Sequence, residues 1–207
     1  MKSLPGIFLF FALTAFGQEY PDYGFTNKAE AKNQMVNGLK EGKWIEYMYG
    51  KEILNDTTWP IYRLVTYKAG KPHGIVREYS KFAGEFTSET PYINGLANGV
   101  RKEYYHHHKL FSETPYTDGE KNGIKKEYYD NGKLSAEIPY KEDKKNGVEH
   151  RYYFNGKPES DIPYTNDKKD GVEKEYFENG GLKQETIYKN DKAQAQKHYD
   201  ENGNEIK

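Results

Sequence analysis

The sequence contains no cysteine, few apolar residues and almost no net charge. Without cysteine, disulfide bonds, zinc–thiolate sites and thiol nucleophiles are excluded. Hydrophobic residues make up 35% of the chain, which is little material for a compact core. The 31 basic and 32 acidic residues leave a formal charge of -1, so the whole molecule has no basic surplus to attract nucleic acid. We therefore expect no nucleic-acid partner.

Aromatic residues are abundant instead, with 20 Tyr and 10 Phe. Disordered chains combine few aromatics with high net charge, so this composition argues against disorder. Tyrosine side chains bury a large area per residue, and they can stabilise a fold that is short of leucine and isoleucine. A thin, elongated sheet with stacked tyrosines would suit this supply.

The N-terminus has the pattern of a secretory signal peptide. Lys2 precedes an apolar run at 4–16, and Ala15-Phe16-Gly17 places small residues at the two positions that a signal peptidase reads. The run is shorter than the roughly 20 residues that a membrane-spanning helix needs. We predict a signal peptide over residues 1–17, cleavage before Gln18, and a secreted or periplasmic mature protein.

A sequence repeat of about 24 residues fills most of the remaining chain. The segments GVRKEYY, GIKKEYY, GVEHRYY and GVEKEYF begin at Gly99, Gly123, Gly147 and Gly171. Earlier copies open at Gly74 and Gly42, with an insertion around residues 55–60 in the first. A second column keeps the same spacing, at Tyr67, Tyr92, Tyr116, Tyr140, Tyr164 and Tyr188. A fixed period of this size indicates a solenoid or array.

Each unit has the pattern of two strands around a tight turn. Asn-Gly pairs recur at 131–132, 155–156 and 179–180, and Asn-Gly is the strongest short signal for a β-hairpin. If Asn131-Gly132 forms a two-residue loop, Tyr129 faces Leu134 and Lys126 faces Glu137. The same count pairs a base with an acid in other units: Lys102 with Glu113, His150 with Asp161, and Lys174 with Glu185. Such pairs penalise slipped registers, which favours a structural role for both charge columns.

These patterns predict an all-β fold: an elongated antiparallel β-meander or solenoid of tandem hairpins. The array spans residues 38–207, with about six repeats and a C-terminal cap. Residues 18–37 form an N-terminal cap or linker, in which residues 26–35 could make a short helix. Polar, turn-forming stretches such as residues 117–122 join the units.

The unit pattern Gly-x-x-x-x-Tyr-Tyr-x-Asn-Gly-Lys-Leu, followed by Glu-x-Pro-Tyr, resembles the bacterial MORN-variant repeat over residues 38–203. The first copy, EGKWIEY, and the later NGKL segment look like the YwqK family of antitoxins. The resemblance implies a β-hairpin array that binds other proteins or, in some members, phospholipid. Antitoxin members neutralise a toxin inside the cell, so an exported relative would have to meet a toxin outside the cytoplasm.

No nucleophile elbow, phosphate loop or dinucleotide fingerprint occurs in the sequence. We therefore expect a non-enzymatic monomer that needs no cofactor and functions in protein–protein recognition, with a toxin as one candidate partner. The alternative is peripheral contact with lipid or the cell envelope through the aromatic and basic columns.

The repeated tyrosines are the best candidates for a binding surface, because tyrosine offers rigid amphipathic contact area at low entropic cost. Adjacent tyrosines on a strand point to opposite faces, so one column can be buried while the other is presented. The sequence leaves open which column is exposed. We assign binding to the second column, formed by Tyr105, Tyr129, Tyr153 and Phe177. The first column, formed by Tyr104, Tyr128 and Tyr152, is expected to be structural.

Three other patterns suggest chemistry less strongly. His106, His107 and His108 are weak candidates for a metal site, because they occupy a hairpin tip where adjacent side chains cannot all converge on one ion. Acids at Glu113 and Glu137 recur in unit after unit, whereas an active site occurs once. The acids between units, at residues 142–143, 167 and 170, do not reproduce the spacing of a calcium loop.

Overall fold

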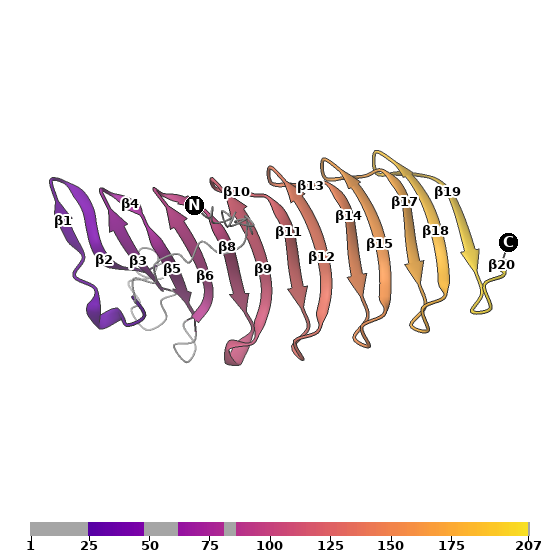
Figure 1. Cartoon of the computed structure of the whole chain (residues 1–207), viewed down its shortest axis with the longest axis horizontal. Coiled ribbons are helices and arrows are strands. Elements are labelled where there is room, and N and C mark those ends of the chain that lie inside the picture. The colour runs from indigo at the N-terminus through magenta and orange to yellow at the C-terminus, as the bar shows by residue number, and fades with distance from the viewer. Residues whose placement is uncertain (1–24, 48–61, 81–85, 207) are drawn as a thin grey trace, which may run out of the picture.

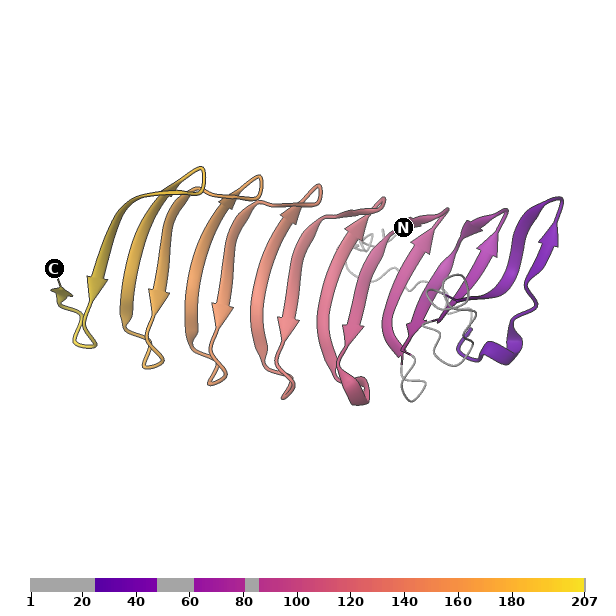
Figure 2. The same ribbon diagram turned by 180° about the vertical axis from the view of Figure 1, so that it is seen from behind.

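In the computed structural model, the strands form one antiparallel sheet in which neighbours along the chain are neighbours in space. The structure describes residues 25–47, 62–80 and 86–206. The predicted signal peptide, its cleavage site and the insertion around residues 55–60 lie outside these ranges. The hairpins stand side by side in a single bowed layer (Figure 1), and the view from behind shows the same order (Figure 2). The predicted all-β meander of tandem hairpins is confirmed.

The described sheet contains two kinds of strand. Longer strands form the body of the layer: β2 (Leu39–Tyr47), β3 (Tyr62–Lys68), β5 (Gly74–Tyr79), β6 (Phe86–Ile93), β8 (Gly99–Tyr104), β9 (Leu110–Thr117), β11 (Gly123–Tyr128), β12 (Leu134–Lys141), β14 (Gly147–Tyr152), β15 (Pro158–Thr165), β17 (Gly171–Tyr176), β18 (Leu182–Lys189) and β19 (Lys192–Tyr199). Shorter strands lie at the edges: β1 (Gln34–Val36), β4 (Lys71–Pro72), β7 (Leu96–Ala97), β10 (Glu120–Lys121), β13 (Lys144–Lys145), β16 (Lys168–Lys169) and β20 (Glu205–Ile206).

The predicted hairpin register is correct through the middle of each unit. Lys126 pairs with Glu137 and Lys102 with Glu113. The same register pairs His150 with Asp161 and Lys174 with Glu185. The opening glycines also pair with the tyrosine column in one register: Gly42 with Tyr67, Gly74 with Tyr92, Gly99 with Tyr116, Gly123 with Tyr140, Gly147 with Tyr164, and Gly171 with Tyr188. The two repeating sequence columns therefore meet at one position of every hairpin.

The turn at the Asn-Gly tip differs from the prediction. Gly132 donates its N–H to the carbonyl of Tyr129 at 2.9 Å, and Tyr129 donates to Lys133 at 2.8 Å. Only Gly132 has a positive φ, whereas a two-residue type I′ turn needs positive φ at both central residues. The loop therefore has three residues, 130–132. Tyr128 pairs with Leu134, and a bulge beside it restores the predicted register, so the expectation that Tyr129 faces Leu134 is wrong.

Tight two-residue turns occur at the opposite edge of the sheet, where the polar stretches join the units. Asp118 and Gly119 have φ values of 51° and 93° and close the pair between Thr117 and Glu120, as a type I′ turn requires. Later units have the same geometry at Glu142-Asp143, Asn166-Asp167 and Asn190-Asp191. We call the edge with the Asn-Gly loops the tip edge, and the edge with these turns the tight-turn edge.

The N-terminal end of the sheet is covered by the chain that precedes it. Phe25 is buried against Leu64 and Tyr79, and Arg77 donates to the Phe25 carbonyl at 3.2 Å. The short helix expected over residues 26–35 is reduced to one 3-10 turn, Lys28–Glu30. The reason is that the next residues pair as β1 with β2, and a paired strand cannot continue a helix.

Candidate recognition groove

The first tyrosine column ties each hairpin to the one before it. Tyr128 donates its hydroxyl to Glu113 at 2.8 Å, and Tyr152 donates to Glu137 at 3.2 Å. Tyr104, Tyr176 and Tyr199 make the same kind of bond to Glu89, Asp161 and Glu185. Burial and the hydrogen bond to Glu113 raise the pKa of Tyr128 to about 12. These contacts fit the structural role expected for this column.

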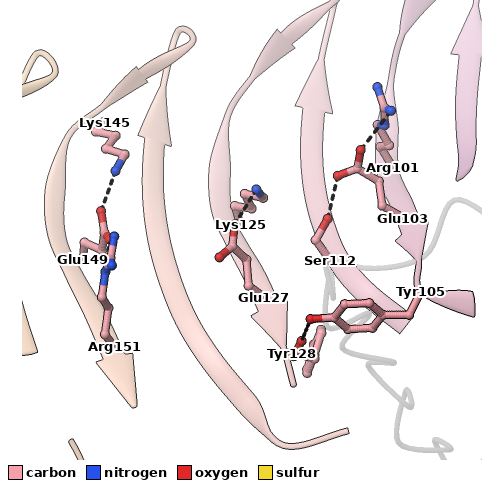
Figure 3. A network of polar contacts seen from close by, with 10 residues as sticks. All are labelled: Arg101, Glu103, Tyr105, Ser112, Lys125, Glu127, Tyr128, Lys145, Glu149 and Arg151. Atoms are coloured by element: carbon pink, nitrogen blue, oxygen red, sulfur yellow. Dashed lines mark hydrogen bonds and ion pairs between the residues drawn. The ribbon is translucent and has the colours of Figure 1, made fainter. Parts of the chain in front are cut away.

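The second column ties each hairpin to the one after it. The Tyr105 hydroxyl donates to the Tyr128 carbonyl at 3.0 Å, as Figure 3 shows. Tyr129 and Tyr153 donate to the carbonyls of Tyr152 and Tyr176 at 2.6 Å. All three side chains lie at the tip edge. Tyr105 is 37% exposed, and Tyr129 and Tyr153 are half-buried. Phe177, also half-buried, continues this position without a hydroxyl. The hydroxyls of the predicted binding column are thus engaged within the chain.

A third column lies on the face opposite the first. Within the part of the chain that the structure describes, Tyr116, Tyr140, Tyr164 and Tyr188 have no hydrogen bond from their hydroxyls, and these hydroxyls are not among the buried unpaired atoms. All four side chains are half-buried, and burial raises the pKa of Tyr116. A lysine ammonium lies near the ring in three units, with Lys121 over Tyr140 at 5.0 Å, Lys145 over Tyr164 at 4.7 Å and Lys169 over Tyr188 at 4.8 Å.

A groove of about 400 Å³ lies beside the third column. Tyr164 lines it toward the tight-turn edge and Tyr153 toward the tip edge, so the second and third columns border the same space. The buried side chains of Ser160 and Ile162 lie between them. Charged residues complete the lining: Arg151, Glu159, Lys169, Glu173, Glu175 and Lys183. We call the side of the sheet that carries this lining the groove face, and the other side the reverse face.

Most carboxylates of the groove have cationic partners, whereas Glu159 has no hydrogen bond or ion pair within the described chain. Glu149, fully buried, accepts from Lys145 at 2.6 Å and from Arg151 at 2.7 Å (Figure 3). Burial alone would raise the pKa of Glu149, but these hydrogen bonds outweigh burial and lower it. Glu173 accepts from Lys169 at 2.6 Å, and Lys183 lies 3.8 Å from Glu175.

The order of charges on the groove face reverses between units. Arg101 pairs with Glu103 at 3.0 Å, and Lys125 pairs with Glu127 at 2.6 Å, so the base comes first along the strand. In the next unit the acid Glu149 comes first and Arg151 follows. The repeats therefore share a backbone but present different charges along the array, which is how one scaffold can distinguish positions on an extended ligand.

Charges on the reverse face form one alternating row across the strands. Each acid pairs in register with a base of its own hairpin and a base of the next, as Glu113 does with Lys102 and Lys126. Beside this row lie exposed aliphatic side chains, at Val100, Ile124, Val148, Val172 and Ile187. The confirmed acid–base columns are thus part of the sheet's own stabilisation.

The three histidines lie at the tip edge, as the repeat register predicts. His106–His108 form a tight loop in which His107 and His108 have left-handed φ values of 61° and 58°, and Tyr105 closes the loop by donating to the Lys109 carbonyl at 2.7 Å. Among the described residues, no group of three or more His, Asp or Glu side chains is placed to hold a metal ion.

The acids between units have a capping role. Asp167 Oδ1 accepts from the Lys145 backbone N–H at 2.8 Å, and the Asp167 N–H donates to the Lys145 carbonyl at 3.0 Å. Asp143 and Asp191 make the same pair of bonds to Lys121 and Lys169. Each tight turn is therefore bonded to the preceding unit.

Three consecutive segments, at residues 121–142, 145–166 and 169–190, match the model of the MORN repeat variant. These three tandem segments are similar to that repeat, and they lie in the C-terminal half of the array. Each matched segment runs from the tight-turn edge of one unit to the tight turn of the next, and together they contain the groove lining from Arg151 to Lys183. The units that open at Gly74 and Gly99 have the same pairing, although the match begins at residue 121. No curated protein matches the chain.

The third column, whose hydroxyls have no partner within the described chain, is not the column to which the sequence analysis assigned binding. The third column was visible in the sequence only as a marker of register. Within the described residues, no helix is long and apolar enough to span a membrane.

Proposed function

We propose that this protein is a non-enzymatic repeat scaffold that recognises an extended segment of a partner protein in the groove. The observation that carries the proposal is the third tyrosine column, whose hydroxyls are not bonded within the described chain. Rigid aromatic side chains with a free donor are typical of binding hot spots. A row of them along an array gives extended contact that no single unit supplies.

The test compares two variants of the mature chain as bait for extracts of the native cell envelope. The groove variant Tyr140→Phe/Tyr164→Phe/Tyr188→Phe removes three hydroxyls and keeps the rings. The control variant Val148→Thr/Val172→Thr alters exposed positions on the reverse face. We expect the groove variant to lose most of the captured partner and the control to retain it. Equal capture by both variants would show that recognition lies elsewhere.

We further propose that the chain is exported and that its partner, a toxin among the candidates, is met outside the cytoplasm. The support is the N-terminal pattern of Lys2, the apolar run at 4–16 and Ala15-Phe16-Gly17. N-terminal sequencing of the protein from its native source should begin at Gln18. Recovery of intact Met1 or Lys2 from a cytoplasmic fraction would contradict export.

A second candidate function is peripheral contact with lipid, which the exposed aliphatic row of the reverse face favours. Flotation with vesicles of neutral and anionic lipid separates this function from the first. If lipid contact is a function, Val148→Asp/Val172→Asp should abolish flotation while capture of the protein partner continues. Absence of flotation by the parent protein would remove this candidate.

A further inference from the structure

We infer that the groove takes a proline-rich segment in the polyproline II conformation, which crosses the strands with one turn per repeat. The inference rests on the proposed function and names the class of partner. Three features support it: the chemistry of the groove, its spacing along the array, and the small residues of its floor.

The tyrosine hydroxyls bring unbonded donors to the groove, and most of its carboxylates already have cationic partners. The Tyr164 hydroxyl has no partner within the described chain, whereas the carboxylates of Glu149 and Glu173 are already occupied by lysine and arginine. A ligand that fits must therefore supply acceptors and need few acceptors itself. Polyproline II has no internal hydrogen bonds, so its carbonyls are free, and proline has no backbone N–H to satisfy.

The spacing of the third column also selects this conformation. Equivalent tyrosines are two strands apart, which is about 9.6 Å at the usual separation of paired strands. One turn of polyproline II is three residues and rises about 9.3 Å. From Tyr116 to Tyr188 there are three intervals, so the accumulated mismatch is only about 0.9 Å.

Other conformations match this spacing less well. Two turns of an α-helix rise about 10.8 Å, which accumulates a mismatch of about 3.6 Å over the same three intervals, and a helix bonds its own carbonyls. An extended β-strand repeats a side-chain direction every two or four residues, about 6.7 or 13 Å, and exposes N–H groups for which Glu159 is the one unpaired carboxylate among the described lining residues.

Ser160 and Ile162 form the floor of the groove between Tyr153 and Tyr164. Small buried side chains recur beneath the tyrosine column, at Ser112, Thr114, Ala136, Ser160 and Thr186. Ile162 adds an apolar surface between Tyr153 and Tyr164. Tyrosine-bordered grooves of this kind suit the flat, preformed ridge of a proline-rich chain, which loses little conformational entropy on binding.

The experiment measures fluorescence anisotropy of labelled peptides built from Ala-Pro-Pro triplets, with the whole mature chain as receptor. Peptides of 6, 9, 12 and 15 residues should bind with rising affinity up to four triplets and level off at the fifth, because the row from Tyr116 to Tyr188 has four tyrosines. Tyr92, the preceding member of the column, packs against the core cluster of Val65, Tyr67 and Val76. An Ala-Gly-Gly peptide of 12 residues, which is flexible, should bind at least tenfold more weakly.

The same pair of variants separates specific binding of the peptide from nonspecific binding. Tyr140→Phe/Tyr164→Phe/Tyr188→Phe should weaken the 12-residue peptide by roughly tenfold or more, since three hydrogen bonds are removed. The control Val148→Thr/Val172→Thr should leave binding unchanged. The inference would be overturned if the affinity did not change with peptide length, or if it were equal for the Ala-Pro-Pro and Ala-Gly-Gly peptides.

Failure of this inference differs from failure of the proposed function. If the proline-rich peptides do not bind but capture of the native partner still depends on the three tyrosines, the groove recognises another conformation and only the inference falls. If the parent and the tyrosine variant capture the native partner equally well, the proposed function is wrong as well. Circular dichroism of both variants must match the parent, so that loss of binding reports on the surface and not on the fold.

Discussion

A side chain on Gly147 would collide with the ring of Pro139. A Cβ atom built there lies 2.9 Å from the Pro139 Cγ, and the backbone of Gly147 has a φ of +123°. The same approach occurs between Gly123 and Pro115 and between Gly171 and Pro163. The repeating glycine and proline are therefore two halves of one contact between neighbouring units.

Replacement of this glycine should destabilise the array at that joint. We expect Gly147→Ala to lower the free energy of unfolding by about 2–4 kcal/mol, from the positive φ and the clash together. Gly132→Ala, which has positive φ and open space around it, should cost only about 1–2 kcal/mol. Urea denaturation followed by circular dichroism compares the two. If Pro139→Ala fails to relieve Gly147→Ala in the double variant, the clash is not the cause.

Asp167 should contribute through its cap on the preceding unit. Asp167→Ala removes the acceptor of the Lys145 N–H and places alanine at a φ of 67°, so we expect a loss of about 1–3 kcal/mol. Asp167→Asn keeps an acceptor and tolerates this φ, and it should cost less than about 0.5 kcal/mol. Asp167→Gly relieves the backbone but not the cap and should fall between them. An alanine variant as stable as the asparagine variant would refute the cap.

The first tyrosine column should make stability fall at high pH. The pKa values of Tyr104, Tyr128 and Tyr176 are raised from 10.0 to about 12, by burial first and by nearby carboxylates. Because these folded pKa values exceed the unfolded one, their contribution is fully present below pH 10 and is lost as pH rises toward 12. Tyrosinate absorbance should show these residues ionising above the ordinary tyrosine pKa of 10.0, and Tyr128→Phe should reduce the pH dependence. Coincident titration of all tyrosines would contradict the bonds to the carboxylates.

Glu149 should be essential to its unit because it is buried between two cations. Glu149→Gln leaves Lys145 and Arg151 without their counter-charge, and we expect a loss of about 1–3 kcal/mol at neutral pH. The folded pKa of Glu149 is lowered from 4.5, so its contribution is present above that value and is lost as pH falls below it.

A charge exchange supplies the matched control for Glu149. Glu149→Arg/Arg151→Glu copies the order of Arg101 and Glu103, and it should be more stable than Glu149→Gln. Thermal unfolding of the three proteins at pH 7 and pH 4 gives the comparison. Equal stability of the glutamine variant and the parent would show that the buried carboxylate contributes nothing.

The sequence by itself determined the period, the hairpins and the register of their middle sections. These follow from local and adjacent-strand chemistry: alternating side chains and a base that falls opposite an acid, as Lys126 does opposite Glu137, allow one alignment of each pair of strands.

Only the tertiary structure decided the turn types and the roles of the tyrosines. Asn131-Gly132 gives a three-residue loop and a bulge, while the type I′ turns form where Asp143, Asp167 and Asp191 bond to the unit before them. Likewise, whether a tyrosine hydroxyl is engaged depends on which carboxylate or carbonyl the neighbouring unit brings within reach, about 15 or 23 residues away along the chain. The repeat makes Tyr128, Tyr129 and Tyr140 look alike in sequence, but stacking of successive units gives the hydroxyls of the first two a partner and leaves the hydroxyl of Tyr140 without one in the described chain.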